Sequence, residues 1–583
     1  MLLAPATKDA ASLISIEAGL TAIAVAVAFC WPGFGAAWFA HIERAFSRLA
    51  RRKSLSVVAV AAGAFLLRLA ILPLCPIPKP FIHDDFSFLL AADTFASGRL
   101  TNPTPAMWRH FETFHLTMAP TYMSMYFPTQ GLILAASRVL TGNPWFGILL
   151  MTALMCAAIC WMLQAWLPPS WALLGGILAI LRLGLFSYWI NTYTGAGSTC
   201  AFAGALVLGA LPRFSRTARP RYALLMAAGV AILGTTRLYE CLLLCIPVTC
   251  YLAWWMIFGK NRPSTPVLLR RAAIPLTVIV AAGIWLGYYN YRAFGSPMTL
   301  PYTLDRAQYA VTPYFVWQPP HHVPNYRHEV VREFYEEIEF KAYQAIQGTS
   351  FLLMIPVKVC NGVLFFAGIA LLAPLIMLRR VLLDHRIRFL VLCLLLLAAG
   401  ELIQVFLFPH YLAAFTAAFY AVGLQAMRHL RLWMPGGQPV GRALVRLTVT
   451  LCVFLAGVRL VAQPLHVAIP IWPGKGIHLW YGFDNRSGAA RAQVKVELEH
   501  LPGKQLAIVR YAPGHDTLDE WVYNAADIDN SKVVWAREMD EAENLELMRY
   551  YGDRTVWLVE PDSKPAKISR YPSCVHASLT ASR

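Results

Sequence analysis

The sequence predicts an all-α polytopic membrane protein with a small C-terminal α/β domain. Of its 583 residues, 57% are hydrophobic and 14% are charged, whereas a soluble domain carries about 25% charged residues. Many apolar stretches approach the roughly 20 residues that a helix needs to cross a bilayer. The third observation is a net charge of +18, whose placement separates a membrane topology from nucleic-acid binding. This composition excludes a soluble enzyme, a disordered chain and a disulfide-stapled scaffold.

The excess of positive charge lies in the first 463 residues. They hold 36 basic and 16 acidic residues, whereas residues 464–583 hold 14 basic and 16 acidic ones. Of the 36, 21 form five short groups between apolar stretches, opposed only by Glu43 and Asp384. The groups lie at 44–53, 213–221, 260–271, 379–388 and 428–446. Short basic clusters beside spans mark cytoplasmic loops, so we expect membrane lipids and no nucleic acid as partners.

Placing these five loops inside predicts about 12 transmembrane helices. The apolar stretches lie at 13–38, 54–77, 145–166, 171–188, 195–211, 222–236, 238–258, 272–290, 351–378, 388–408, 411–427 and 443–463. A further run at 129–140 is too short to cross and breaks the alternation, so we expect an interfacial or re-entrant helix there. The transmembrane domain, 1–463, then has two large outer loops, at 79–144 and 292–349, and both termini lie outside.

The C-terminal domain, 464–583, shows the pattern of a small α/β layer. Residues 505–511, 532–538 and 555–560 are rich in β-branched and aromatic residues and predict buried strands. Residues 489–500 and 541–551 predict helices beside them. The domain contains one cysteine and therefore no internal disulfide. It has no glycine-rich phosphate loop, so we expect a structural or acceptor-docking module.

The strongest candidate site directly follows the second apolar stretch. His83, Asp84 and Asp85 stand there between aromatic residues, and charged residues at the edge of spans are costly and therefore indicate function. Two adjacent carboxylates repel each other, which raises at least one pKa toward the range of a general base. With the histidine they could also bind a divalent metal. The alternative is a solvated loop whose acids cap the next helix.

Further candidate residues fall on the same outer side of the predicted topology. Arg237 can hold a phosphate bidentately, or it can pair with Glu240 one helical turn along. Asn191 and Tyr193 lie in an aromatic and amide-rich turn suited to sugar contacts, or to an interfacial aromatic belt. His410 stands at another outer turn, where a single histidine is more often structural.

The second large outer loop adds polar and aromatic residues to this side of the molecule. Tyr302, Asp305 and Arg306 stand close together in the sequence. His321 and His322 are adjacent and point in different directions in any regular structure. They are therefore a weak candidate for a metal pair.

The acidic pair and the aromatic residue that follows it resemble a known motif. Asp84-Asp85-Phe86-Ser87-Phe88 resembles the Asp-Glu-x-x-aromatic motif of GT-C glycosyltransferases, which include protein O-mannosyltransferases, the lipid A aminoarabinose transferase and RgtA-type enzymes. Residues 126–131 (YFPTQG) resemble the segment that opens the last interfacial helix of the first outer loop in these families. Residues 89–103, 237–240, 288–295 and 521–529 resemble an uncharacterised bacterial branch. Asp85 departs from the usual Glu, and Phe127-Pro128-Thr129 from the usual pair of prolines.

The resemblance implies a GT-C-like fold in the bacterial inner membrane, with the active site and C-terminal domain on the periplasmic side. It implies inverting transfer of a hexose or pentose from a polyprenyl-phosphate donor to a lipid, glycan or protein acceptor. Asp84 would be the base, Asp85 would orient the acceptor or a metal, and Arg237 with His410 would bind the donor phosphate. The substrate-binding candidates are His83, Asn191, Tyr193, Glu240, Tyr302 and Arg306. No nucleotide is expected, because the donor arrives activated on lipid, and a divalent metal held by His83, Asp84 and Asp85 stays open.

The competing class is a secondary transporter or flippase for a lipid-linked or polar substrate. Transporters place charged residues near the bilayer midplane and often contain inverted repeats. This sequence shows no internal repeat, and its candidate acids lie at the outer edge of spans. A catalytically inactive scaffold that presents the C-terminal domain is the third possibility.

Overall fold

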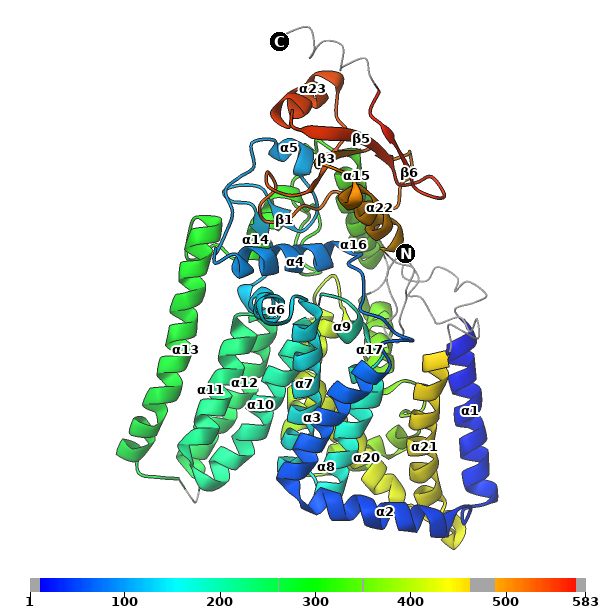
Figure 1. The fold of residues 1–583 in the computed structure, drawn as a ribbon. Helices are drawn as coiled ribbons and strands as arrows, with labels where there is room; N and C mark the ends of the chain where they lie inside the picture. The colour runs from blue at the N-terminus through cyan, green and yellow to red at the C-terminus, as the bar shows by residue number, and fades with distance from the viewer. Residues whose placement is uncertain (1–10, 195, 260–261, 349–350, 462–487, 573–583) are drawn as a thin grey trace.

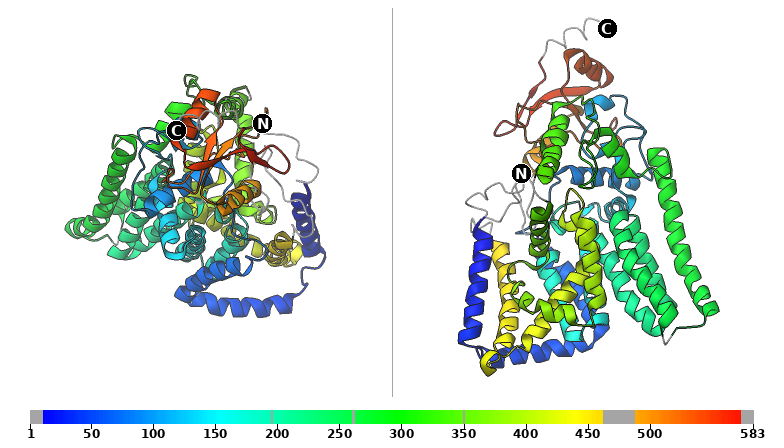
Figure 2. Two further views of the ribbon diagram at one scale, coloured as in Figure 1. Left: turned by 45° about the horizontal axis from the view of Figure 1, so that its top comes forward. Right: turned by 180° about the vertical axis from the view of Figure 1, so that it is seen from behind.

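The computed structural model describes residues 11–194, 196–259, 262–348, 351–461 and 488–572. It is mostly helical: a tall helical bundle carries a layer of shorter elements at one end, and a small sheet domain lies on top of that layer (Figure 1). Figure 2 shows the same order of layers from two further directions. The predicted boundary between residues 463 and 464 lies outside the described residues.

Each predicted apolar stretch overlaps a helix of the bundle, although several stretches run over more than one element. The helices are α1 (Ala11–Cys30), α3 (Lys53–Ala70), α7 (Trp145–Trp166), α8 (Pro169–Ala179), α10 (Ala196–Thr217), α11 (Pro220–Gly234), α12 (Leu238–Phe258), α13 (Thr265–Phe294), α17 (Phe351–Ala367), α19 (Arg388–Leu402), α20 (Thr416–Arg431) and α21 (Val440–Val461). Within the described ranges, six are long and apolar enough to cross a membrane, namely α3, α7, α10, α12, α13 and α21. The count of 12 spans therefore stays a prediction.

Short elements complete the bundle where its long helices turn or break. They are the π-helical turn η1 (Ile180–Gly184), α9 (Tyr188–Asn191), η3 (Ala373–Met377), α18 (Leu378–Leu383), η4 (Pro409–Phe415) and η5 (Pro435–Gly437).

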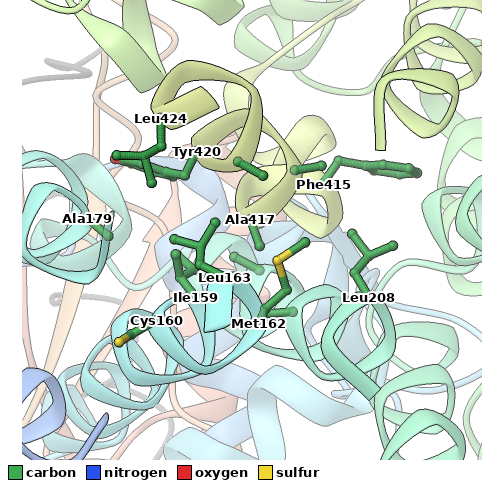
Figure 3. Packing of buried hydrophobic residues seen from close by; sticks show 14 of the residues in the cluster. Ile159, Cys160, Met162, Leu163, Ala179, Leu208, Phe415, Ala417, Tyr420 and Leu424 are labelled. Carbon is green, nitrogen blue, oxygen red and sulfur yellow. The ribbon is translucent and has the colours of Figure 1, made fainter. Parts of the chain in front are cut away.

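The core of the bundle lies between α7, α8, α10 and α20. Figure 3 shows Ile159 and Leu163 of α7 packed toward Leu424 of α20, with Leu208 of α10 beside them. Backbones approach closely where glycines face neighbours: a Cβ on Gly204 of α10 would lie 1.8 Å from the carbonyl oxygen of Ala414 in η4. This contact fixes η4, which carries His410, against the bundle.

The lower end of the bundle in Figure 1 carries basic residues and one helix that lies across it. The predicted stretch 13–38 is not one span: α1 ends at Cys30, and α2 (Ala36–Arg51) then runs along the bottom. Pro32 and the glycines beside it break the helix between them. Glu43 of α2 pairs with Arg431 and Arg446 at 3.0 and 2.9 Å. Glu43, one of the two acids that oppose the basic groups, thus joins three helices.

The first outer loop forms the layer above the bundle. It contains α4 (His83–Ala96), α5 (Trp108–Phe111), the hairpin β1 (Leu116–Thr117) and β2 (Met123–Ser124), and α6 (Pro128–Thr141). Helix α4 runs across the upper ends of the bundle helices, and α6 is seen almost along its axis, so it also lies across them (Figure 1). The predicted short interfacial helix at 129–140 agrees with α6, which has 14 residues.

The second outer loop adds α14 (Pro301–Tyr309), α15 (Glu329–Arg332), the π-helical η2 (Glu333–Phe340) and α16 (Lys341–Gly348). These elements were not predicted, because the loop has no sustained helical period. Together with the first outer loop they close the upper end of the bundle.

The C-terminal domain has the predicted α/β layout. It contains α22 (Ala489–His500), β3 (Lys504–Val509), β4 (Val533–Arg537), α23 (Glu541–Tyr550), β5 (Arg554–Glu560) and β6 (Lys567–Arg570). The sheet order is β4-β3-β5-β6; β3 is parallel to both neighbours, and β6 is antiparallel to β5. The three predicted strands and two predicted helices are confirmed to within two residues. Strand β6, with its exposed pattern, was missed.

Candidate active site

The acidic pair lies in the first turn of α4. Ile82 is the residue before the helix, with an extended backbone and no side-chain cap, and Asp84 and Asp85 follow it. Acidic residues in a first turn are stabilised by the positive end of the helix dipole. The capping alternative is therefore wrong in detail, since neither acid occupies the cap position.

Asp84 forms a hydrogen-bonded cluster with two residues of the same outer loop. Its Oδ1 accepts a hydrogen bond from His115 Nδ1 at 2.7 Å and another from the Tyr126 hydroxyl. Its Oδ2 takes no hydrogen bond within the described ranges, and 25% of the side chain is exposed. One oxygen is thus anchored, and the other is free to meet a substrate.

Hydrogen bonding fixes the charge of this cluster. Burial acts to raise the pKa of Asp84, but the hydrogen bonds from His115 and Tyr126 outweigh it and hold the pKa below its usual range. Burial likewise acts to lower the pKa of His115, and the bond to Asp84 prevails and raises it. The contact between Asp84 and His115 therefore favours an ionised carboxylate and a protonated imidazole.

The backbone of His115 adopts a conformation that is unusual for a residue with a side chain. Its φ is +59°, in the left-handed region that costs about 1 kcal/mol or more outside glycine. The Ser87 hydroxyl of α4 donates to the His115 carbonyl at 2.7 Å and holds this geometry. The turn before β1 thus aims the imidazole ring at Asp84.

Asp85 has a different set of partners from Asp84. Its Oδ1 accepts the backbone N–H groups of Tyr193 and Thr194 at 2.6 and 3.1 Å, and its Oδ2 accepts that of Phe81 at 3.1 Å. The residue is 1% exposed, and burial, more than the charge of Asp84, raises the pKa of its carboxyl to about 7. Oδ1 thus ties α4 to the turn that contains Tyr193, and Oδ2 ties it to the segment just before the helix.

His83 is buried on the side of α4 that faces the C-terminal domain. Its Nδ1 lies 2.9 Å from the Tyr523 hydroxyl, and its ring packs 4.2 Å from that of Phe114. Burial lowers its pKa well below the usual value, so the ring is neutral. His83, Asp84 and Asp85 thus take separate partners and do not converge as a metal site. Among the described residues, no group of three or more His, Cys, Asp or Glu could hold a metal ion.

Arg237 stands just before α12 and pairs with Glu240 one turn along. Its guanidinium group also lies over the ring of Tyr411, 4.4 Å from the ring centre. The side chain is largely buried. The pairing with Glu240 is therefore confirmed, whereas phosphate binding by Arg237 stays a prediction.

His410 of η4 lies in the same region as Arg237 and Asp84, whose charges both act on its ring. The Tyr188 hydroxyl accepts the backbone N–H of His410 at 3.0 Å and lies 2.7 Å from its Nδ1. When the hydroxyl donates to Nδ1, a neutral ring carries its proton on Nε2 and presents one N–H donor near the arginine.

Helix α14 closes this region from the second outer loop. The Tyr302 ring packs edge-on against Tyr126, with centroids 5.4 Å apart, and the charges of Arg237, Glu240 and Asp84 act on its hydroxyl. Tyr302 therefore lies between the acidic cluster and the arginine. One turn along, Arg306 instead pairs with Glu339 at 3.0 Å.

Asp305, on the same helix, is a buried acid for which we predicted no role. It is 1% exposed, and its Oδ1 has no hydrogen-bond partner among the residues that the structure describes. Burial raises its pKa to about 6, against the opposing charges of His115 and Arg306. A second carboxyl group therefore faces the histidine from the other outer loop.

Two predicted substrate-binding residues lie elsewhere, in structural contacts. Asn191 accepts a hydrogen bond from Arg68 at 3.0 Å and donates to the Ser187 carbonyl. The Tyr193 hydroxyl donates to the Pro78 carbonyl at 3.2 Å. They shape the turn that Asp85 holds.

The C-terminal domain packs directly on α4. The Tyr523 ring stacks on the Phe86 ring, with centroids 4.2 Å apart and an angle of 6° between the planes. The Arg491 guanidinium group also lies over the Phe86 ring, 4.6 Å from its centre. Asp93 of α4 accepts the backbone N–H of Ala526 at 2.8 Å. The segment 521–529 is thus part of the support of the acidic cluster.

His115, Tyr126, Tyr188 and Tyr411 complete the site and were not among the predicted site residues. Tyr126 is the first residue of the YFPTQG segment, so the motif could have identified it as a site residue. His115 and Asp84 are 31 residues apart, and no local pattern joins them.

Comparison with known proteins gives matches among solved structures only. No family model matches the chain, and no curated protein matches it. ArnT from Cupriavidus metallidurans in the apo state is 12% identical and has a TM-score of 0.48; the match covers 86% of this chain and 92% of that one. The same protein bound to undecaprenyl phosphate is 10% identical, with the same coverage and a TM-score of 0.42.

The Archaeoglobus fulgidus oligosaccharyltransferase in the apo form is 11% identical, with a TM-score of 0.44. The match covers 79% of this chain, which spans only 62% of the length of that enzyme. These neighbours are GT-C membrane glycosyltransferases, the superfamily that the sequence motif resembles. At TM-scores below 0.5 they carry no argument about substrate or mechanism.

Proposed function

We propose that this protein transfers a sugar from a polyprenyl-phosphate donor to an acceptor hydroxyl or amine by inverting single displacement. The observation that carries the proposal is Asp84, whose Oδ1 is anchored by His115 and Tyr126 while Oδ2 is free. A general base must reach the proton that it removes and must be ionised at working pH. Asp84 satisfies both conditions.

The displacement uses groups on both sides of the reacting sugar. The acceptor atom forms a bond to the anomeric carbon, its proton passes to Asp84 Oδ2, and the bond from that carbon to the donor phosphate breaks. The bonding electrons leave with the phosphate, where Arg237 and the His410 Nε2–H supply positive charge and a donor. Groups placed where charge develops are the most effective in catalysis.

The structure leads us to assign a supporting part to Asp85. Because three backbone N–H groups occupy its oxygens, it holds α4 rather than orienting an acceptor. His83 similarly ties α4 to Tyr523. No step is routed through a metal ion at these residues, since they do not converge.

The location we propose follows from the charge pattern. With 12 spans and the basic loops inside the bacterial inner membrane, the acidic cluster and the C-terminal domain face the periplasm. The donor lipid then reaches Arg237 from the membrane, and a lipid, glycan or protein acceptor reaches Asp84 from the opposite side.

A reconstituted transfer assay tests the proposal. Proteoliposomes receive a mixture of polyprenyl-phosphate sugars and cell-envelope extract as acceptor, with and without EDTA, and mass spectrometry follows the free polyprenyl phosphate and the product. We expect consumption of one donor by the wild type and by the exposed control Glu329→Gln, and none by Asp84→Asn. Equal consumption by Asp84→Asn would overturn the assignment. Movement of labelled donor across the bilayer without its consumption would instead support the flippase alternative.

A further inference from the structure

A cavity of about 240 Å³ lies between the two outer loops, apart from the acidic cluster. Its walls combine aromatic rings, an amide, a carboxylate and a guanidinium group. The lining residues used below are Trp108, Glu112, Gln308, Tyr309, Tyr326 and Arg327. Aromatic faces with a few convergent polar groups are typical of small-ligand sites.

Glu112 is the feature of this cavity that points to a ligand. The residue is 5% exposed, and its Oε1 accepts the Tyr309 hydroxyl at 2.9 Å. Arg327 Nη1 lies 3.5 Å from Oε2, and His328 Nε2 lies 3.6 Å from it. Contacts of that length are weak at best, so a buried carboxylate oxygen keeps acceptor capacity that only a donor inside the cavity would use well.

The aromatic lining indicates which class of ligand carries that hydrogen-bond donor. Trp108 carries the Arg327 guanidinium on its ring, 4.6 Å from the centre, and Tyr309 and Tyr326 form other parts of the wall. Such rings pack on apolar C–H faces, while a carboxylate, an amide and a guanidinium group bind hydroxyls. A ligand with both surfaces in a small volume is a saccharide ring.

Helix α14 joins this cavity to the acidic cluster. Tyr302 near its start contacts Tyr126, which donates to Asp84, and Tyr309 at its end donates to Glu112. Seven residues of α-helix span about 10 Å. Helix α5, which contributes Trp108 to the cavity wall, lies on the side of α4 away from the bundle (Figure 1), where an acceptor rather than a membrane lipid would arrive.

We propose that this cavity binds a saccharide unit of the acceptor, set back from the unit that receives the sugar. The inference rests on the proposed function, because it takes Asp84 as the point of attack. Glu112 and Gln308 bind hydroxyls of the ring, and Trp108 and Tyr309 pack against its faces. A glycan acceptor is then favoured over an unglycosylated protein or a simple lipid.

Binding can be measured without donor, on the full-length protein in detergent micelles. Saturation-transfer NMR would use three probes: maltotriose as a neutral saccharide, a trigalacturonate as an acidic one and a chitosan trimer as a basic one. We expect at least one to bind, with a Kd raised tenfold or more by Glu112→Gln and by Trp108→Ala. Trp317→Ala, which changes an exposed tryptophan of the second outer loop, is the control and should bind as the wild type does.

Two results would overturn the inference: binding of none of the three saccharides, or binding that Glu112→Gln and Trp108→Ala leave unchanged while both variants keep the wild-type Tm. The outcome is separable from that of the proposed function. Saccharide binding that depends on Glu112, in a protein that consumes no lipid-linked sugar, supports the cavity and rejects the transfer. Sugar transfer whose acceptor KM is unchanged in Glu112→Gln and in Trp108→Ala supports the proposed function and rejects the cavity as an acceptor site.

Discussion

Two of the clusters of buried charge among the described residues differ in what their polar atoms contact. In the outer cluster, Asp84 is anchored by His115 and Tyr126 through one oxygen and leaves the other free. In the inner cluster, between bundle helices, Glu17 accepts the backbone N–H groups of Ile369 and Ala370 through one oxygen, and its other oxygen lies 3.7 Å from Arg459.

The inner cluster joins the ends of three bundle segments. Arg182 of η1 donates to the carbonyls of Leu364 and Phe365 near the end of α17, directly before the turn at Gly368, whose φ is +61°. Glu17 of α1 reaches the other side of that turn. Charge within an apolar bundle is often functional, but here its partners are backbone groups at a helix break. The comparison teaches that free acceptor capacity, more than charge itself, marks the candidate site.

The largest effect is expected from removing the free carboxylate oxygen. Asp84→Asn should lower kcat/KM for sugar transfer by about 10²–10⁴-fold, the range of general base catalysis, while the Tm stays near that of the wild type. Initial rates and thermal unfolding of the same sample measure both. A large loss of Tm would show that Asp84 has a structural role, as Glu17 does, and would contradict the contrast between the two clusters.

Glu17→Leu should have the opposite signature. It leaves two backbone N–H groups and Arg459 without their carboxylate, and breaking a buried ion pair costs about 3–5 kcal/mol. Unfolding in detergent should therefore shift to a clearly lower temperature, with kcat per folded molecule unchanged. An unaltered Tm together with lost transfer would make the inner cluster a functional site, as the transporter alternative requires.

Arg237→Lys tests the residue that we propose binds the donor phosphate. Lysine keeps the charge but loses the planar fork and the packing on Tyr411, so we expect kcat/KM to fall about 10²-fold, within the range found for lost transition-state donors. Affinity for free polyprenyl phosphate, measured by competition, should fall with it. Arg216→Lys, at the opposite end of the bundle, is the control and should change neither value.

The smallest effect is a displaced pH profile. In the wild type the bond to His115 holds the pKa of Asp84 below its usual value, so the base stays ionised and activity persists as the pH falls toward about 4. His115→Gln weakens that support, the pKa rises, and the acidic limb of kcat/KM should move to higher pH. An acidic limb at the same pH in both proteins would remove His115 from the cluster.

The regular parts of the fold could be predicted because they depend on local pattern. Helix α22 was predicted at its observed limits, and α6 was recognised as too short to cross, since burial period and length decide both. The break between α1 and α2 was missed although Pro32 and its glycines mark it, because hydropathy was read across them. The elements of the second outer loop carry mixed polar sequences without a clear period.

The site residues could be predicted only in part, because the sequence shows local patterns and not the contacts between distant residues. Asp84, Arg237, His410 and Tyr302 could be found because charged or aromatic residues at span edges are conspicuous. Their partners could not, since the bonds from Asp84 to His115 and from Tyr188 to His410 join residues 31 and 222 positions apart. The different partners of Asp84 and Asp85 likewise depend on how α4 is oriented. That orientation cannot be predicted from two adjacent acidic residues in the sequence.

The packing of Tyr523 on Phe86 also has a consequence for how the protein is made. Helix α4 leaves the ribosome early, whereas the residues that cover His83 and Phe86 belong to the last part of the chain. The acidic cluster therefore gains its full support only when translation is nearly complete. A prematurely terminated chain would lack Tyr523 and would leave His83 and Phe86 of α4 without this cover.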